Sequence, residues 1–426
     1  MKTCPKHIFH ITFHFFFKQI EIQSHIEQIK LFYTELLDYL DDESCPKESS
    51  EKLFQIFEEM QIFESKLKLN DILYLLSKIS KNHQRSALFN DKIKHILFSI
   101  ISNIKQTLSN SEIFKIFRSN KLLLLFLIEN KTITIDKEIS RYFINNETKN
   151  YLFFFYPEIK EFISKEEQQK IEEKMPDFYQ ENKTLFEEYR HQGENESYVC
   201  SLIRQDLIQE FVIFVNKTNF SLLNKIETSI FETNSFLMDK NPTLIEYASF
   251  FGSIQIIKYL QLNQVEITES MWLYAIHSNN ADLIHLIEEN CDKSSFASYM
   301  NYCEESIKCH HNEIADYIKD NFLNQDVVER FYKTIIRYFN YYYFPANIIN
   351  MISTGNEKSN GFNICDFAYL FSEISIPSSV TCIGKYAFKN CYQLKEISIP
   401  SSVTKIDDYA FYGCISLKQI SIPSSV

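Results

Sequence analysis

The heptapeptide ISIPSSV occurs three times, at residues 374–380, 397–403 and 420–426, and each copy begins 23 residues after the one before it. The residues around it repeat as well, so that the full unit reads CxxLxxIxIPSSVxxIxxYAFxN/G. A unit this short cannot bury its apolar face alone, and copies of it bury that face by stacking on one another. We therefore predict a solenoid of short strands and turns at this end of the chain.

Within each unit, the Ile-x-Ile segment favours a short strand, in which side chains alternate between two faces. If Ile397 and Ile399 point inward, Glu396 and Ser398 lie on the exposed face. Strands of neighbouring copies lie about 4.8 Å apart, so equivalent residues form a serine ladder beside an acidic row. This surface is either simply solvated or binds a polar or basic partner. The candidate interaction face comprises Glu373, Ser375, Glu396, Ser398, Gln419 and Ser421.

Other positions of the repeat are predicted to form its core. Cys391 and Cys414 occupy the same position and suit a ladder of small buried thiols. The structural residues of the tail are Phe388, Leu394, Ile397, Ile399 and Phe411. The chain holds only two full intervals of 23 residues, fewer than such arrays usually need, and the last strand has an open edge. We expect the tail to be only marginally stable by itself. It therefore packs on the preceding domain, pairs with another chain or belongs to a longer product.

Residues 241–260 predict a helical hairpin. Asn241 has the side chain of a helix N-cap, and Pro242 suits the first helical position. Ala248 marks a point where a neighbouring helix approaches closely. Gly252 ends the helix, because a left-handed residue without a Cβ satisfies the last carbonyls at no steric cost.

This hairpin recurs twice. Twenty-seven residues on, Ala275 takes the place of the alanine and Asn279 that of the glycine, and asparagine is the next best residue for a left-handed position. A third copy follows after a step of 31 residues and places His310 in the turn. We predict three consecutive hairpins.

The hairpins resemble ankyrin repeats, whose fingerprint runs Thr-Pro-Leu-His-x-Ala before a glycine turn and a second helix. Thr243, Ala248 and Gly252 match it, whereas residues 244–246 replace the proline, leucine and histidine. The resemblance implies a protein-binding helical array, and the replaced residues put the β-hairpin fingers of ankyrin proteins in question.

The tail resembles the BspA-like class of leucine-rich repeats, found in bacterial surface antigens and in large protist multigene families. Ala368 and Phe371 replace Cys391 and Leu394 in a degenerate first copy. With the ankyrin-like hairpins, the chain resembles a protist protein of this two-part type. The resemblance implies a surface or adhesive role without a defined ligand.

We therefore predict a mostly α fold with a short α/β solenoid tail. Apolar residues that return at intervals of three and four indicate helices before the hairpins, and STGNEKSNG has the composition of a linker. The predicted parts are a helical N-terminal region (1–190), ankyrin-like helical repeats (191–325), an aromatic segment with a linker (326–366), and BspA-like leucine-rich repeats (367–426).

Charge and composition narrow the partners and the compartment. The net charge of −12 argues against non-specific binding to nucleic acid or anionic membranes, which needs a basic patch. The longest apolar runs are far shorter than the ~18 residues of a membrane-spanning helix, so we predict no transmembrane segment. The apolar N-terminus is interrupted by His10 and His14 and has no small-x-small cleavage site, so we interpret it as a helix or strand. The ten scattered cysteines favour a reducing, cytoplasmic compartment, whereas the resemblance implies the cell surface.

Two histidine-rich segments are candidates for metal binding. His7, His10 and His14 share one helical face, but no carboxylate or cysteine lies in register with them. The segment CEESIKCHH at 303–311 matches neither Cys-x2-Cys nor His-x3-5-His spacing. Phosphate-binding glycine loops and a Gly-x-Ser-x-Gly motif are absent from the sequence. We predict no catalytic residue, no cofactor and no metal.

These observations favour a non-catalytic protein-interaction protein whose partner is unknown. One hypothesis is surface adhesion through the tail, and the alternative is an intracellular ankyrin-type scaffold or adaptor. A metal-dependent enzyme that uses one of the histidine clusters is the least favoured hypothesis. Self-association through the open repeat edge is a further prediction.

Overall fold

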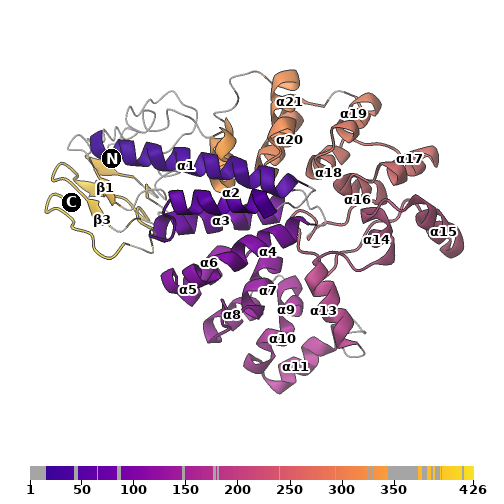
Figure 1. Ribbon diagram of the computed structural model, residues 1–426, viewed down its shortest axis with the longest axis horizontal. Helices are drawn as coiled ribbons and strands as arrows, with labels where there is room; N and C mark the ends of the chain where they lie inside the picture. The colour runs from indigo at the N-terminus through magenta and orange to yellow at the C-terminus, as the bar shows by residue number, and fades with distance from the viewer. Residues whose placement is uncertain are drawn as a thin grey trace, which may run out of the picture. The chain divides into compact units, whose positions relative to one another are not determined.

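The described chain is mostly helical, as its sequence predicts (Figure 1). Packing divides it into two compact units, residues 39–323 on the one hand and residues 1–38 with 324–426 on the other. The computed structural model describes residues 16–42, 47–64, 66–83, 88–145, 149–175, 179, 182–238, 240–292, 294–323, 327, 330–343, 373–376, 381–384, 387–388, 394, 396–414 and 417–426.

The first part of the larger unit is an array of helices whose apolar faces are buried. Polar N-caps begin several of them: Ser109 and Glu112 form a capping box, and Asn120 Oδ1 accepts a hydrogen bond from Leu123 N at 3.0 Å. The helices are α2 (Lys47–Glu59), α3 (Lys66–Asn82), α4 (Phe89–Ser99), α5 (Ile101–Thr107), α6 (Asn110–Phe117), α7 (Lys121–Glu129), α8 (Lys137–Asn145), α9 (Lys149–Phe154), α10 (Tyr156–Ile159), η1 (Lys160–Phe162), α11 (Lys165–Glu172) and α13 (Lys183–Gln192).

Four helical hairpins follow one another in the rest of this unit (Figure 1). After each first helix the chain turns at a residue with a left-handed backbone: Asp206 (φ 50°), Gly252 (φ 70°), Asn279 (φ 50°) and His310 (φ 64°). The last three turns lie where the sequence predicts them. The first hairpin, which turns at Asp206, is not among the three hairpins that the sequence predicts. The hairpins are α14 (Tyr198–Arg204) with α15 (Ile208–Thr218), α16 (Leu244–Phe251) with α17 (Ile254–Leu262), α18 (Met271–Ser278) with α19 (Ala281–Asn290), and α20 (Phe296–Cys309) with α21 (Asn312–Phe322).

The predicted start of α16 is wrong by two residues. Thr243, not Asn241, is the N-cap, and it forms a capping box with Glu246. Pro242 lies before the helix rather than at its first position. The reason is that the chain is still extended there: the Pro242 carbonyl accepts a hydrogen bond from Ile226 N at 2.7 Å, and Thr243 forms an antiparallel bridge with Lys225.

Successive hairpins are tied by an interaction that recurs at equivalent positions. Ser253, which follows the left-handed Gly252, donates from Oγ to the carbonyl of Ile203 in the preceding hairpin at 2.6 Å. His311, which follows the left-handed His310, bonds through Nδ1 to the carbonyl of Ile276 at 2.7 Å. In both cases the acceptor lies three residues before the left-handed residue of the preceding hairpin.

The hairpins are also close-packed along their first helices. Ala248 and Ala275 have no exposed surface where α16 and α18 meet, as close approach requires. The Asp206 carboxylate accepts hydrogen bonds from the backbone N of Gln255 and Ile256, both at 3.0 Å. The turn of the first hairpin therefore caps the second helix of the next one.

The last hairpin packs against α3, so the two parts of the larger unit are in direct contact. A non-helical stretch whose second half is mostly buried, the connector (residues 225–238), links them further. Lys121 at the start of α7 is fully buried and donates from Nζ to the carbonyls of Ile230 and Glu232, each at 3.1 Å. Between these carbonyls Phe231 is fully buried. A buried ammonium needs such acceptors, and it fixes the connector to the helical array.

The smaller unit contains α1 (Phe16–Asp41) up to residue 38, α22 (Tyr332–Tyr338), η3 (Tyr341–Tyr343) and the repeat tail. Tyr33 on α1 donates from its hydroxyl to Asn340 Oδ1 at 3.1 Å and packs edge-on against Tyr341. Residues from opposite ends of the sequence therefore share one core.

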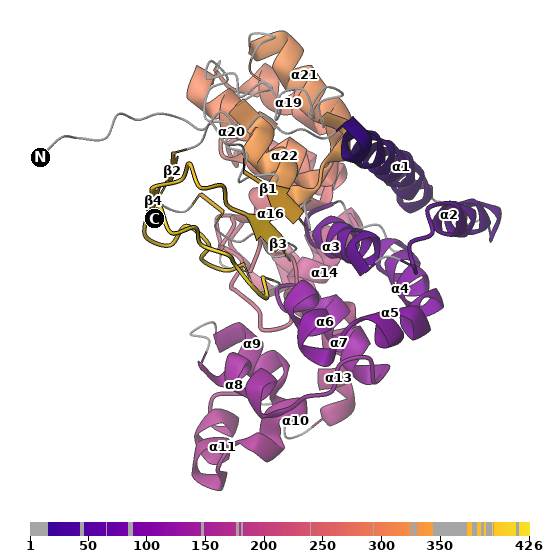
Figure 2. The same cartoon turned by 90° about the vertical axis from the view of Figure 1, so that its left-hand side faces the viewer.

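The tail strands are parallel and pair at the repeat interval, and β1 lies beside β3 in Figure 2. Glu373, Ile374 and Ser375 face Glu396, Ile397 and Ser398 in register. The second pair joins residues 382–383 to 405–406. The strands are β1 (Glu373–Ser375), β2 (Cys382–Ile383), β3 (Glu396–Ser398) and β4 (Lys405–Ile406).

Candidate functional site

The exposed face of the tail strands is the candidate interaction face. Glu396 and Ser398 are exposed on β3, whereas Ile397 and Ile399 are 6% and 8% exposed. Register with β1 places Glu373 next to Glu396 and Ser375 next to Ser398. On the other side, Ser421 bridges Ser398, and both Ser421 and Gln419 are exposed. The six residues therefore occupy two rows of aligned backbone positions, one of serines and one of two glutamates followed by a glutamine.

Beneath this face the tail has a small core. Leu394 is fully buried, and Phe388 (3% exposed) stacks on Phe411 with 5.2 Å between the ring centroids. Cys414 is half-buried and donates from Sγ to the Phe388 carbonyl at 3.0 Å. Cys391 lies outside the described residues. Ile422 is 58% exposed.

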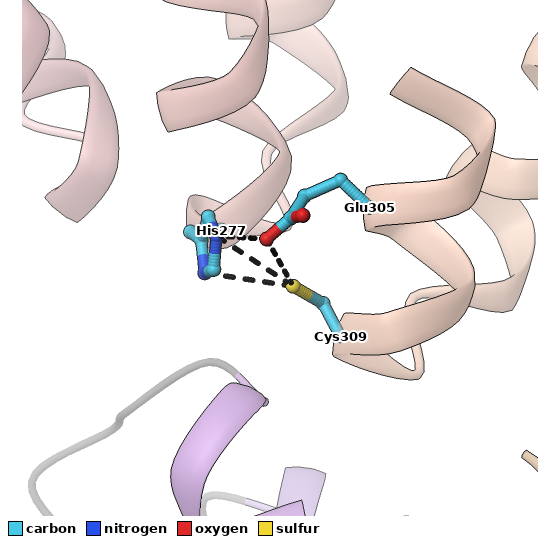
Figure 3. Close-up of side chains that lie close together, drawn as sticks. All are labelled: His277, Glu305 and Cys309. Carbon is cyan, nitrogen blue, oxygen red and sulfur yellow. Dashed lines mark hydrogen bonds and ion pairs between the residues drawn. The ribbon is translucent and has the colours of Figure 1, made fainter. Parts of the chain in front are cut away.

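A second cluster, formed by His277, Glu305 and Cys309, lies in the larger unit (Figure 3). Glu305 and Cys309 are four residues apart, so they share one face of α20, and this face packs on α18, which carries His277. Cys309 has no exposed surface and His277 is 3% exposed. Two neighbouring hairpins thus bring three side chains, with nitrogen, oxygen and sulfur donors, together at a largely buried site.

The distances in this cluster show which atoms donate and which accept hydrogen bonds. His277 Nε2 lies 2.9 Å from Glu305 Oε1, and Cys309 Sγ lies 3.5 Å from His277 Nδ1. Burial lowers the pKa of His277 despite the neighbouring carboxylate, so the imidazole is neutral. It donates from Nε2 to Glu305 and accepts at Nδ1 from the Cys309 thiol.

Electrostatics keep the thiol protonated and the carboxyl ionised. Burial raises the pKa of Cys309 well above its usual range, and the charge of Glu305 adds to this. Burial alone would raise the pKa of Glu305, but hydrogen bonds from His277 and Lys308, with the charge of Lys308, lower it to about 2. Lys308 Nζ lies 2.7 Å from Glu305 Oε1. A buried, protonated thiol is a poor nucleophile.

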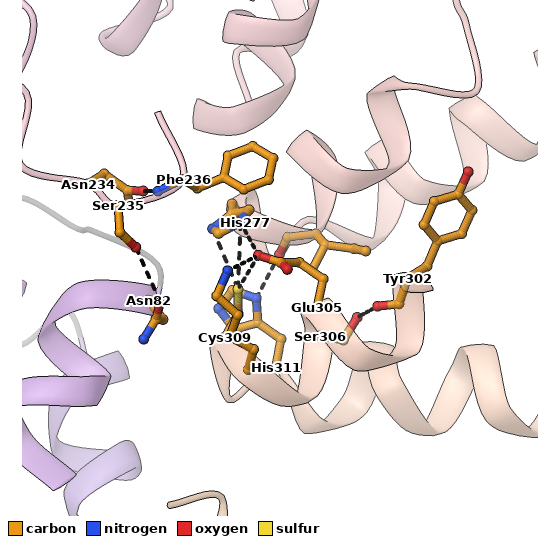
Figure 4. Close-up of polar contacts among 12 residues, drawn as sticks. Asn82, Asn234, Ser235, Phe236, His277, Tyr302, Glu305, Ser306, Cys309 and His311 are labelled. Carbon is orange, nitrogen blue, oxygen red and sulfur yellow. Dashed lines mark hydrogen bonds and ion pairs between the residues drawn. The ribbon is translucent and has the colours of Figure 1, made fainter. Parts of the chain in front are cut away.

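Aromatic rings lie next to the cluster, and Figure 4 shows Phe236 beside His277. The His277 ring lies 4.2 Å from the ring of Phe236 in the connector and 4.9 Å from that of Phe250. His83 at the end of α3 bonds to the Cys309 carbonyl at 2.9 Å through Nδ1. Three separate stretches of chain therefore meet around it.

The segment 303–311, which the sequence singles out, supplies Glu305 and Cys309 to the cluster, whereas His277 lies outside it. Cys303 bonds elsewhere, to the Ala315 carbonyl. Hairpin alignment held the missing signal: His277 precedes its left-handed turn residue by two positions and Cys309 precedes its own by one. Equivalent ends of adjacent first helices lie side by side, so the alignment of the hairpins places His277 close to Cys309.

One other group in the described residues has metal-binding donors, Glu129, Glu187 and His191. It is largely exposed, and His191 Nε2 contacts Glu129 Oε1 at 2.8 Å. It lacks a thiol and is a surface ion-pair network. His7, His10 and His14 lie outside the described residues.

Comparison with known proteins agrees with the tail prediction. Residues 359–426 match the family model described as BspA type leucine rich repeat region (6 copies). No curated protein and no solved structure matches the chain. The BspA-like resemblance of the tail is confirmed, whereas the ankyrin resemblance and the protist family stay predictions. In the part of the chain that the structure describes, no helix is long and apolar enough to cross a membrane.

Proposed function

We propose that this protein is a non-catalytic binding protein that contacts a protein partner through the candidate interaction face of its tail. The observation that carries the proposal is the in-register pairing of β1 with β3, which aligns like residues of successive repeats. The BspA-type match of the same residues supports an interaction role. The buried state of the Cys309 thiol supports the absence of hydrolytic chemistry at the cluster.

The chemistry of the face favours a basic or hydroxyl-rich partner. Glu373 and Glu396 occupy paired positions on neighbouring strands, and like charges at directly opposite positions are destabilising. A lysine or arginine of a partner relieves this repulsion, while the serines donate and accept hydrogen bonds. Each exposed ion pair contributes only about 0–1 kcal/mol, so affinity depends on several repeats acting together.

The finer proposal is adhesion at a cell surface, which the BspA-type tail supports. The alternative is an intracellular scaffold, which the four stacked hairpins support. Protease treatment of intact cells separates the two: loss of the tail epitope before lysis is the result expected for a surface protein. Protection of the epitope until lysis would favour the scaffold and contradict surface adhesion.

Site-specific photocrosslinking tests the interaction face. A photoreactive amino acid replaces Ser398 on the face or, as a matched control, Lys405 on the other strand pair. We expect protein adducts from position 398 and few from 405, and we expect Glu396→Lys to reduce the adducts at 398 strongly. Equal yields from both positions, or none at 398, would show that this face is not the binding surface.

A further inference from the structure

The donors of the buried cluster are spaced for a metal ion. His277 Nε2, Glu305 Oε1 and Cys309 Sγ form a triangle with sides of 2.9, 3.8 and 4.0 Å. We propose that these three residues form a zinc site that joins the third and fourth helical hairpins. The proposal is independent of the function proposed for the tail.

Tetrahedral geometry supports this. With Zn–N and Zn–O bonds of about 2.1 Å and a Zn–S bond of about 2.3 Å, the donor atoms stand about 3.4 Å (N to O) and about 3.6 Å (S to N or O) apart. The observed sides differ from these values by about half an ångström or less. Small side-chain rotations are enough to place all three donors on one ion.

The donor set selects the metal. A thiolate with an imidazole favours zinc over calcium or magnesium, which prefer oxygen ligands alone. Binding replaces the thiol proton of Cys309, which is released to solvent, and the imidazole proton moves from Nε2 to Nδ1. The thiolate and the Glu305 carboxylate balance the two charges of the ion. The cluster offers three protein ligands, so water takes the fourth position.

Lys308 opposes binding, because its ammonium bonds to the same carboxylate oxygen. The Lys308 side chain is 19% exposed, so the ammonium reaches solvent when the ion binds. Lys240, whose Nζ lies 3.5 Å from the centre of the Phe236 ring, is the other nearby cation. Removing the Lys308 charge should therefore tighten metal binding while weakening the metal-free cluster.

Cobalt and zinc titrations of the full chain, first stripped of metal under reducing conditions, test the site. Cobalt bound by a thiolate gives an intense near-ultraviolet charge-transfer absorption. We expect one cobalt ion per chain with this absorption, displacement by zinc, and a higher melting temperature with zinc. A folded chain that binds neither ion in large molar excess would overturn the proposal without recourse to any variant.

Variants locate the site. Cys309→Ser should abolish the cobalt absorption and weaken zinc binding by more than about 100-fold, exceeding the usual loss for a residue that only supports a ligand. Cys303→Ser is the matched control, because it removes another buried thiol from the same helix. Lys308→Gln should bind zinc more tightly than the unmodified chain. Absorption that survives in Cys309→Ser, or equal losses in both serine variants, would show that the ion binds elsewhere.

Discussion

Two glycines, Gly193 and Gly252, share the same left-handed backbone conformation but have different neighbours. Replacing each by alanine therefore separates the steric contribution to the loss of stability from the contribution of the backbone conformation. Gly193 (φ 69°) ends α13 and Gly252 (φ 70°) ends α16. A Cβ at Gly252 meets Ser278 Cβ at 3.3 Å, whereas a Cβ at Gly193 meets Thr233 Oγ1 at 2.9 Å and Leu122 Cδ1 at 3.2 Å. The contacts at Gly193 are shorter and come from two directions.

The magnitudes follow from these contacts. In both alanine variants the left-handed backbone lowers the free energy of unfolding by about 1–2 kcal/mol. Alanine also reduces the conformational entropy of the unfolded chain, which restores about 0.4–1 kcal/mol of that loss. Gly252→Ala therefore loses about 1 kcal/mol. Gly193→Ala also displaces Thr233, which donates from Oγ1 to the Gly193 carbonyl at 2.7 Å. Overpacking of about 1–3 kcal/mol and a lost hydrogen bond of about 1 kcal/mol bring its loss to about 3–5 kcal/mol.

Thermal unfolding followed by circular dichroism of the full chain measures the difference. A change of 1 kcal/mol shifts the melting temperature by about 2–4 °C in a unit of this size. We expect a decrease of about 2–4 °C for Gly252→Ala and about three to five times as much for Gly193→Ala. Equal shifts for the two variants, or a larger one for Gly252→Ala, would refute the assignment of the extra cost to the Thr233 contact.

Three further changes test other parts of the fold. Thr243→Ala removes the side-chain half of a capping box and should lower the free energy of unfolding by about 1 kcal/mol in denaturant titrations; no change would mean that Glu246 alone holds the helix start. Asp206→Ala should speed hydrogen exchange at the Gln255 and Ile256 amides, and unaltered exchange there would contradict capping across hairpins. Phe388→Ala should cost about 3–5 kcal/mol, enough to open the tail to limited proteolysis while the helical unit stays resistant.

The tail was readable from sequence because its signal is repetition. Stacking places equivalent residues side by side, so a 23-residue period implies that Ile374, Ile397 and their neighbours pair in register. Turn chemistry was similarly local: Gly252 and Asn279 marked left-handed positions that need no knowledge of the rest of the fold.

The errors came from interactions with distant partners. The start of α16 was placed at Asn241 because a hydrogen bond from Ile226 to Pro242 has no trace in the local sequence. His277 was overlooked because its meeting with Cys309 depends on how two hairpins pack. The first hairpin was missed because its turn residue is Asp206 rather than a glycine or an asparagine. The carboxylate of Asp206 caps the next hairpin, and this interaction has no trace in the local sequence.

The contact between α3 and the last hairpin bears on how the protein is made. His83 bonds to the carbonyl of Cys309, 226 residues later in the chain. At a synthesis rate of about 5–20 residues per second, the ribosome delivers the second partner about 10–45 s after the first. During that interval the part of α3 that contacts the last hairpin has no packing partner there, which exposes the nascent chain to chaperones and to aggregation. Completion of the larger unit is therefore a late event that follows translation of its last hairpin.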